Sequence, residues 1–334
     1  MGGTQRGLWT IGHRVSFKVF SDKAFQYITE LLNLIENGAP WPRATTKGRL
    51  AFLAKDPDNP HDVLAHRLLS ILSVLYRKWG TVRLKNLIPW AADWKVDGFF
   101  AGFGGVGAEE AWWETALIIE EHLIDGTPFT IGSADIFKCF DQIQRDIIYA
   151  MAARLGMYPH VLDAYARFQE ALDMHNTIAG GLGRAFTKLC GIPQGCPLSM
   201  LIIAMAMLPW VQMMHEIKVI PRILADDILI ATNGHMHLKQ FVHAMNLTHL
   251  YILDIGGKIA PSKSRILTND KAANDWLNDY TWKHVKQNIP TTAHMRDLGA
   301  HIFVAQWRKD NTLSQRMNLV CQITRTLKKV ASWF

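Results

Sequence analysis

Hydrophobic residues recur along this chain with two different spacings, which predict helices in some stretches and strands in others. Apolar positions three or four residues apart predict helices over 21–36, 61–79, 108–123, 142–155, 159–172, 237–252 and 314–334. Short apolar runs between turn residues predict strands over 50–54, 129–136, 220–224, 228–232 and 301–304. A tight turn joins the strands 220–224 and 228–232, so the pattern predicts an α+β fold with an antiparallel hairpin at its centre.

Residues 197–214 form the longest apolar stretch, with fourteen apolar residues out of eighteen. A stretch of this kind is either a membrane span or a helix buried in a large domain. Because Ser199, Pro209 and Gln212 interrupt it, we favour a buried helix and expect no membrane partner. The first fifteen residues lack the apolar segment of a signal peptide, and the four cysteines lack zinc-ligand spacing. We therefore expect an intracellular protein, located in the nucleus, the cytoplasm or both.

The charge of the chain is unevenly distributed around a net value of +7. Basic residues exceed acidic ones by six over 41–95 and by seven over 200–334, whereas acidic residues exceed basic ones by seven over 96–199. Two basic segments on either side of an acidic one are consistent with a polyanionic partner such as nucleic acid.

Three carboxylates stand next to the predicted strands. Asp226 and Asp227 lie at the turn of the hairpin, which alone could be an ordinary polar tip, and Asp135 ends an apolar run. If Asp135 faces the hairpin, the three form a cluster suited to two Mg²⁺ ions, or Mn²⁺ in their place, because these cations prefer oxygen ligands. Two such ions activate a 3′-hydroxyl and stabilise a leaving pyrophosphate. For Asp141, we favour an N-cap of the next helix.

A loop rich in glycine and proline, GIPQGCPLS, covers 191–199 and leads into the long apolar helix. Gly195 would allow a backbone to approach a ligand closely, and Gln194 offers both a hydrogen-bond donor and an acceptor. Turns of this composition are common before helices, so the loop alone does not identify an activity.

Taken together and in this order, these three segments resemble the palm motifs of reverse transcriptases. DIFKCFD at 135–141 is similar to the first motif, D-x-x-K-A-F-D. The loop at 191–199 is similar to the second, G-x-x-Q-G-x-x-L-S, and LADD at 224–227 resembles the third, Y-A-D-D. The resemblance is nearest to reverse transcriptases of the non-LTR retrotransposon type.

Four further segments extend this resemblance. LDIGGKIAPSKSRIL at 253–267 is similar to the fourth palm motif, and DLG at 297–299 resembles the K-Y-L-G element of the primer grip. Lys55 together with RLLSILSVLYRK at 67–78 is similar to the fingers motifs. The segment at 100–111 resembles the G-F-R-x-G element that precedes the palm.

The resemblance covers about residues 41–334 and implies the right-hand fold of polymerases. In that fold, an antiparallel palm sheet with an RRM-like core is packed by helices and joined to fingers and a partial thumb. The implied parts are an N-terminal extension at 1–40, fingers at 41–127, a palm at 128–290 with a fingers insertion at 142–190, and the primer grip with the start of the thumb at 291–334.

The implied activity is that of an RNA-directed DNA polymerase, a nucleotidyltransferase that uses an RNA template, a DNA primer and dNTPs. By resemblance, Asp135, Asp226 and Asp227 are the catalytic ligands of two Mg²⁺ ions. Lys263 then supplies a proton or a positive charge to the leaving pyrophosphate, although a solvated surface lysine is the alternative.

The nucleotide-binding residues also follow from the resemblance. Lys55 and Arg67 would hold the triphosphate, since an arginine binds phosphate oxygens with both arms of its guanidinium. Phe140 would lie under the incoming sugar and favour deoxynucleotides, with a core phenylalanine as the alternative. Gln194 and Gly195 would contact the template and the incoming nucleotide.

Leu298 and Gly299 correspond to the primer grip. Three positions depart from the family pattern: Leu224 replaces the usual tyrosine, which touches the primer end, Leu68 replaces a proline, and Met200 stands where a proline commonly follows. None of these changes removes an expected metal ligand.

Two alternative functions share these motifs. The first is a catalytically inactive retroelement remnant that binds nucleic acid through its basic segments. The second is an RNA-copying polymerase that makes RNA, against which Phe140 argues. Because no endonuclease-like segment precedes the implied fingers and the implied thumb is incomplete, we expect a fragment or a degenerate copy.

Overall fold

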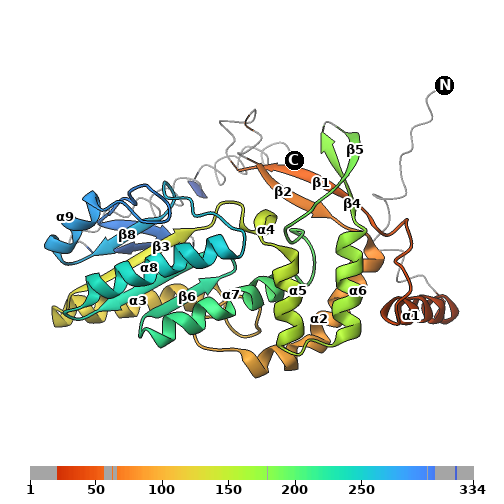
Figure 1. Ribbon diagram of the computed structural model, residues 1–334, viewed down its shortest axis with the longest axis horizontal. Helices are drawn as coiled ribbons and strands as arrows, with labels where there is room; N and C mark the ends of the chain where they lie inside the picture. The colour runs from red at the N-terminus through yellow and green to blue at the C-terminus, as the bar shows by residue number, and fades with distance from the viewer. Residues whose placement is uncertain are drawn as a thin grey trace. The chain divides into compact units, whose positions relative to one another are not determined.

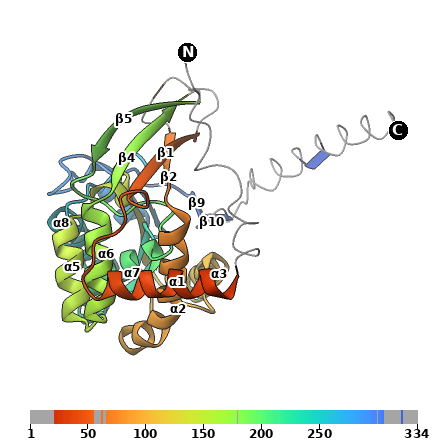
Figure 2. The ribbon, with the colours of Figure 1, turned by 90° about the vertical axis from the view of Figure 1, so that its right-hand side faces the viewer.

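The computed structural model describes residues 21–55, 62, 66–178, 180–298, 300–304 and 320–321 (Figures 1 and 2). The chain folds into two compact units. Unit 1 contains residues 1–97, 138–209 and 254–257, and unit 2 contains residues 98–137, 210–253 and 258–334. Each unit has its own four-stranded sheet.

The sheet of unit 1 has the strand order β2-β1-β4-β5. Its strands are β1 (Lys47–Ala54), β2 (His66–Ile71), β4 (Asp173–Ile178) and β5 (Gly181–Thr187). β1 runs antiparallel to β2 and parallel to β4, and β4 and β5 form a hairpin. Side chains alternate between the two faces of a strand, so Leu50 and Met174 are buried on one face while Arg49 lies on the other. All residues of β5 are exposed at the sheet edge.

Helices pack beneath this sheet around a cluster of aromatic rings. They are α1 (Asp22–Glu36), α2 (Val74–Trp94), α4 (Cys139–Gln142), α5 (Arg145–Arg154), α6 (Pro159–Glu170) and the beginning of α7 (Ser199–Glu216). Tyr76 stacks on Phe168 with 3.5 Å between ring centroids, and Trp41 and Trp79 meet Tyr76 at 5.6 Å. Figure 1 shows α5 and α6 side by side. This cluster joins α2 to α6 and forms much of the core of unit 1.

The sheet of unit 2 is fully antiparallel and has the strand order β6-β7-β3-β8. Its strands are β3 (Phe129–Asp135), β6 (Ile220–Leu224), β7 (Asp227–Asn233) and β8 (Arg265–Thr268). The other elements are α3 (Ala108–Asp125), α8 (His237–Asp254), α9 (Lys271–Asp279) and the hairpin of β9 (His294–Asp297) and β10 (Ala300–Phe303). Ile131 and Leu229 pack toward Met295 of the hairpin, while Gly132 faces Phe241 of α8. The sheet is therefore covered on both faces.

Most of the predicted elements are confirmed, including the α+β class, the central hairpin and the helices that begin at 22, 108, 159 and 237. The apolar stretch forms α7, whose side chains are mostly buried. None of the described helices has both the length and the apolar character needed to cross a membrane.

The helix predicted over 61–79 is wrong in its first part. Residues 66–71 form strand β2, and the helix begins only at Val74 and continues past Pro89 to Trp94. The leucines at 68, 69 and 72 fit a helical period, but pairing with β1 decides the conformation of Leu68 and Leu69. Strands β4, β5, β8 and β9 and helix α9 were not predicted. The predicted helix 314–334 lies outside the described residues except for 320–321, which are helical.

Candidate active site

The β6–β7 hairpin of unit 2 carries two of the predicted acidic residues at its tip. Leu224 pairs with Asp227, which leaves Ala225 and Asp226 as a two-residue turn. Ala225 has a φ of +60°, as the first central residue of a type II′ turn requires. An alanine in this left-handed region costs about 1–2 kcal/mol. The tip is thus held in a strained conformation by the two buried strands behind it.

The register of the sheet brings the third predicted acidic residue to this tip. Asp135, the last residue of β3, lies opposite Asp227, the first residue of β7. Asp135 and Asp226 are half-buried and Asp227 is exposed. The expectation that Asp135 faces the hairpin is therefore met at the level of the backbone.

The three-carboxylate cluster itself stays a prediction. Within the described parts of the chain, no group of three or more His, Cys, Asp or Glu side chains is arranged to hold a metal ion. The donors nevertheless fit Mg²⁺ in kind, because this ion binds through one or two carboxylates and takes its other ligands from phosphates and water.

The segment that resembles the fourth motif fixes the end of β3. The N–H of Asp135 donates to Ser264 Oγ at 3.1 Å, and its carbonyl accepts from the N–H of Ala260 at 2.8 Å. The N–H of Phe137 donates to the carbonyl of Lys258 at 2.8 Å. Lys263 lies between Ala260 and Ser264 in this segment, so its backbone is close to that of Asp135. Its side chain is exposed, and its predicted role stays a prediction.

The hairpin of β9 and β10 brings the predicted primer-grip residue Leu298 to the same region. Leu298 and Asp297 line a cavity of about 10 Å³ together with Arg222, Leu224 and Asp227. Leu298 has a φ of +47° at the turn of the hairpin. Gly299 lies outside the described residues. Unit 2 therefore contains five described residues that were predicted as site residues: Asp135, Asp226, Asp227, Lys263 and Leu298.

A buried arginine under this region was missed by the sequence analysis, which named Asp297 only as part of the segment 297–299. Arg222 is buried, forms an ion pair with Glu114 of α3 and lies 5.5 Å from the ring centroid of Phe100. Burial raises the pKa of Asp297 to about 6, and the nearby Arg222 opposes that rise. The only signal in the sequence was an arginine inside the otherwise apolar run 220–224.

In unit 1, the loop 191–199 is held against β2. The N–H of Ser70 donates to the carbonyl of Gln194 at 2.7 Å. Gly195 has a φ of +115°, and a Cβ there would lie 2.5 Å from the carbonyl oxygen of Ser70. The close approach that glycine permits at this position is therefore to a strand of the same unit.

The same loop contacts the segment of the first motif. Gly191 has a φ of +86°, and a Cβ there would lie 2.7 Å from the carbonyl oxygen of Phe140. That oxygen accepts from the N–H of Ile192 at 2.6 Å. Phe140 itself is half-buried in α4. The first and second motifs are thus joined through their backbones.

The interpretation of Asp141 as an N-cap is wrong. Asp141 lies inside α4, and the N-cap of α5 is Gln144. The Asp141 carboxylate instead accepts from Lys188 Nζ at 2.6 Å and from Gln194 Nε2 at 3.5 Å. Asp141 therefore orients Gln194, the glutamine of the second motif. The signal in the sequence was that Asp141 is the last residue of the motif DIFKCFD.

The predicted triphosphate contacts lie at one end of the unit 1 sheet. Arg67 is exposed on β2 and pairs with Leu53, and Lys55 is exposed directly after β1. The structure thus brings Lys55 and Arg67 to the same end of the β1–β2 pair, and brings Phe140 and Gln194 to the loop 191–199 of the same unit.

Comparisons with known proteins agree with these motifs. The family model described as reverse transcriptase (RNA-dependent DNA polymerase) matches residues 61–302. A search of curated proteins found no match.

Solved structures similar to this chain include two of telomerase from Candida tropicalis. One is the apo enzyme truncated from its C-terminal domain, which is 12% identical with a TM-score of 0.56 over 80% of this chain and 54% of that chain. The other contains a TWJ fragment of telomeric RNA and is 12% identical with a TM-score of 0.55 over 87% of this chain and 49% of that chain. This chain therefore spans about half the length of each telomerase chain. The likeness shows the fold, which is the right-hand polymerase fold.

The family model covers well over half of the chain and includes the first three palm motifs. The chain therefore belongs to the reverse transcriptase (RNA-dependent DNA polymerase) family.

Proposed function

We propose that this chain is an RNA-directed DNA polymerase of a non-LTR-type retroelement, which adds deoxynucleotides to a primer 3′-hydroxyl along an RNA template. The observation that carries the proposal is the register of Asp135 with Asp227, beside the turn that holds Asp226. Family membership supports nucleotidyl transfer in general. The resemblance of the motifs, taken together, is nearest to the non-LTR type.

Asp135, Asp226 and Asp227 are the residues that would hold divalent cations. When bound, two Mg²⁺ ions would supply positive charge that activates a 3′-hydroxyl nucleophile and stabilises a leaving pyrophosphate. Two features of the chain support this assignment. The strained turn presents acidic residues on rigid strands, and Ser264 fixes the backbone at the end of β3. Pre-positioned carboxylates of this kind suit a site completed by phosphates and water.

The chain's own residues would select and orient the nucleotide. The Phe140 ring would lie under the sugar, where a 2′-hydroxyl would clash with it. Gln194 would contact the template and the nucleotide in an orientation set by its hydrogen bond to Asp141. Lys55 and Arg67 would neutralise the triphosphate. Leu298 would contact the primer near its end.

Primer extension tests this proposal. Purified protein is supplied with a DNA primer annealed to an RNA template, dNTPs, and Mg²⁺ or Mn²⁺. We expect a product complementary to the RNA, and no product when the template is digested beforehand or the cation is chelated. Protein that binds the primed template but gives no product with either cation would contradict the polymerase activity and leave the inactive remnant.

Ribonucleotides distinguish the RNA-making alternative. We expect the wild type to use dNTPs and the substitution Phe140→Ala to admit ribonucleotides, because the smaller side chain leaves room for the 2′-hydroxyl. Phe241→Ala truncates a fully buried phenylalanine of unit 2, and an equal gain of ribonucleotide use in it would contradict the role of Phe140. A wild type that prefers ribonucleotides would favour an RNA-making polymerase.

A further inference from the structure

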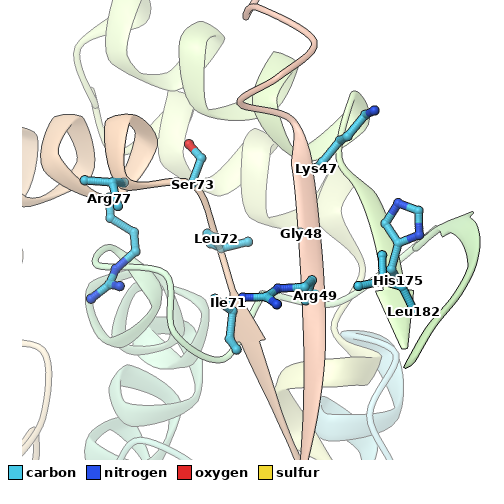
Figure 3. Close-up of a pocket in the computed structure, with 10 residues that line it drawn as sticks. Lys47, Gly48, Arg49, Ile71, Leu72, Ser73, Arg77, His175 and Leu182 are labelled. Carbon is cyan, nitrogen blue, oxygen red and sulfur yellow. The ribbon is translucent and has the colours of Figure 1, made fainter. Parts of the chain in front are cut away.

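A cavity in unit 1 has no place in the reaction described above. It lies where the start of α2 meets β1, β2 and β4 (Figure 3). Its volume is about 90 Å³. Its lining residues are Lys47, Gly48, Arg49, Ile71, Leu72, Ser73, Val74, Arg77, His175 and Leu182.

The polar lining of this cavity is strongly basic. Lys47, Arg49, Arg77 and His175 come from three different elements, and none of the described residues that line the cavity is acidic. Asp173 lies opposite Lys47 in the register of β1 and β4, so its negative charge partly offsets the positive charge of that lysine. Arg49 and Arg77 therefore dominate the field, and like charges brought together in this way attract an anion.

The basic side chains come from different sides of the cavity. In Figure 3, Arg49 extends from β1 toward Ile71, Arg77 comes from α2, and His175 stands on the β4 side. His175 Nδ1 hydrogen-bonds to the carbonyl of Gly183 at 3.0 Å, which holds the ring in place. Arg77 is exposed and Arg49 is half-buried, so an anion can reach both from solvent.

The size of the cavity limits the ligand. A cavity needs about 10–15 Å³ to hold one water molecule, so one of about 90 Å³ has room for several waters or one phosphate group. The apolar rim at Ile71 and Leu182 suits the sugar of a strand that passes over the phosphate.

The cavity is separate from the predicted triphosphate contacts. β1 leads from Arg49, at the cavity, to Lys55 at the other end of the strand. Six residues of extended strand span about 20 Å. Phosphates of a stacked strand follow one another at about 3.4 Å along the axis, so the two positions would be about six nucleotides apart.

We propose that this cavity, built around Arg49 and Arg77, binds a phosphodiester group of a single nucleic-acid strand away from the reacting nucleotide. The inference rests on the proposed function only in naming a nucleic-acid strand as the ligand. One guanidinium group can bind two phosphate oxygens at once. Two arginines that line the same cavity therefore define where a phosphate of the strand binds. The site would fix the register of the strand along unit 1.

The test is the affinity for a short single-stranded RNA, measured by fluorescence anisotropy at several salt concentrations without divalent cations or nucleotides. Each phosphate contact with a single strand contributes about 0.7 to the slope of log K against log salt. Because both arginines hold the same phosphate, we expect Arg49→Gln with Arg77→Gln to lower the slope by about 0.7 and to weaken binding about tenfold or more. Inorganic phosphate should compete with the RNA for this site in the wild type. In the double variant, it should no longer compete at this site.

Two controls make the result specific. Lys85→Gln removes one positive charge from an exposed position of the same helix, outside the cavity, and should leave affinity nearly unchanged. Arg77→Lys keeps the charge and should retain most of the salt dependence. Circular dichroism and the unfolding midpoint confirm that each variant is folded.

The outcomes separate this inference from the proposed function. Equal losses in Arg77→Gln and Lys85→Gln would overturn it, since bulk charge would then explain binding. It would also be overturned if the double variant bound RNA like the wild type, even if wild-type protein bound inorganic phosphate. Protein that binds RNA as expected but extends no primer contradicts the polymerase alone. Protein that extends primers while the double variant binds normally contradicts this site alone.

Discussion

The two sheets of this molecule differ in burial and in the charged side chains that they present. The unit 2 sheet is covered on both faces, with Asp135 and Asp227 at strand ends and Asp226 in the turn between β6 and β7. The unit 1 sheet leaves one face and one edge exposed and presents Arg49 and Arg67 there. A buried sheet holds acidic residues rigidly at its end, which suits positioned chemistry. An exposed sheet with basic side chains suits contact with an extended polyanion.

The largest effect is expected where a glycine of unit 1 meets backbone. In Gly195→Ala, the Cβ would lie 2.5 Å from the carbonyl oxygen of Ser70 in a conformation with φ of +115°. We expect a loss of about 3 kcal/mol or more in the free energy of unfolding, from strain and overpacking together. Gly180→Ala has a φ of +81° but open space around the Cβ, so it should cost only about 1 kcal/mol. Urea unfolding measures both, and equal losses would contradict the close approach.

The next effect concerns pH and the helix under the unit 2 sheet. His249 of α8 is fully buried, and burial lowers its pKa from 6.5 to about 4, with a smaller contribution from His284. The folded state therefore favours the neutral ring. Its contribution to stability is complete above pH 6.5 and is lost as the pH falls toward 4, by about 3 kcal/mol at 1.36 kcal/mol per pH unit.

Replacing the ring should flatten this pH dependence. We expect His249→Leu to lose less stability than the wild type between pH 6.5 and pH 4, because no buried ring has to be protonated. His243→Leu changes an exposed histidine of the same helix and should follow the wild-type curve. Parallel curves for wild type and His249→Leu would show that the ring is accessible to water.

A moderate effect contrasts the covered sheet with the loop of unit 1. In Gly132→Ala, the Cβ would lie 2.4 Å from Cζ of Phe241, which is a side chain and not backbone. Overpacking of a core typically costs about 1–3 kcal/mol. Phe241→Leu should recover part of this loss in the double variant, whereas no side-chain change can relieve Gly195→Ala. A strictly additive double variant, measured by urea unfolding, would contradict this explanation.

The smallest effect compares one ion pair from each unit. Lys188 and Asp141 in unit 1 are both mostly buried, with side chains 17% and 19% exposed, whereas Glu114, the partner of Arg222 in unit 2, is 54% exposed. Double-mutant cycles of unfolding should give a coupling of about 1–2 kcal/mol for the first pair and about 0.5–1 kcal/mol for the second. The reverse order would mean that Arg222 depends on Glu114 more than their exposure indicates.

The sequence predicted unit 2 better than unit 1, for a physical reason. Ile131 and Leu229 belong to apolar runs that are buried in any fold, so their strands and the acidic tip follow from the local pattern. Strand β2 carries the exposed Leu69 and Ile71, and its conformation depends on pairing with β1. Local periodicity cannot supply such a partner.

The candidate site divides in the same way. The motifs predicted Asp135, Asp226 and Asp227, and the register explains why Asp135 lies opposite Asp227, beside the turn that holds Asp226. The contact between Gly195 and Ser70 and the meeting of Arg49 with Arg77 each join segments far apart in the chain. Only the folded structure brings these residues together, so no local pattern could have predicted them.

The most direct test of the central claim is the rate of primer extension on an RNA template in Asp226→Asn, measured beside Asp275→Asn. Both changes remove one negative charge from unit 2, but Asp275 is exposed on α9, away from the hairpin tip. We predict that Asp226→Asn slows nucleotide addition about a thousandfold or more, equal to about 4 kcal/mol of barrier, while Asp275→Asn keeps the wild-type rate. Equal extension rates in the wild type and Asp226→Asn would contradict the account.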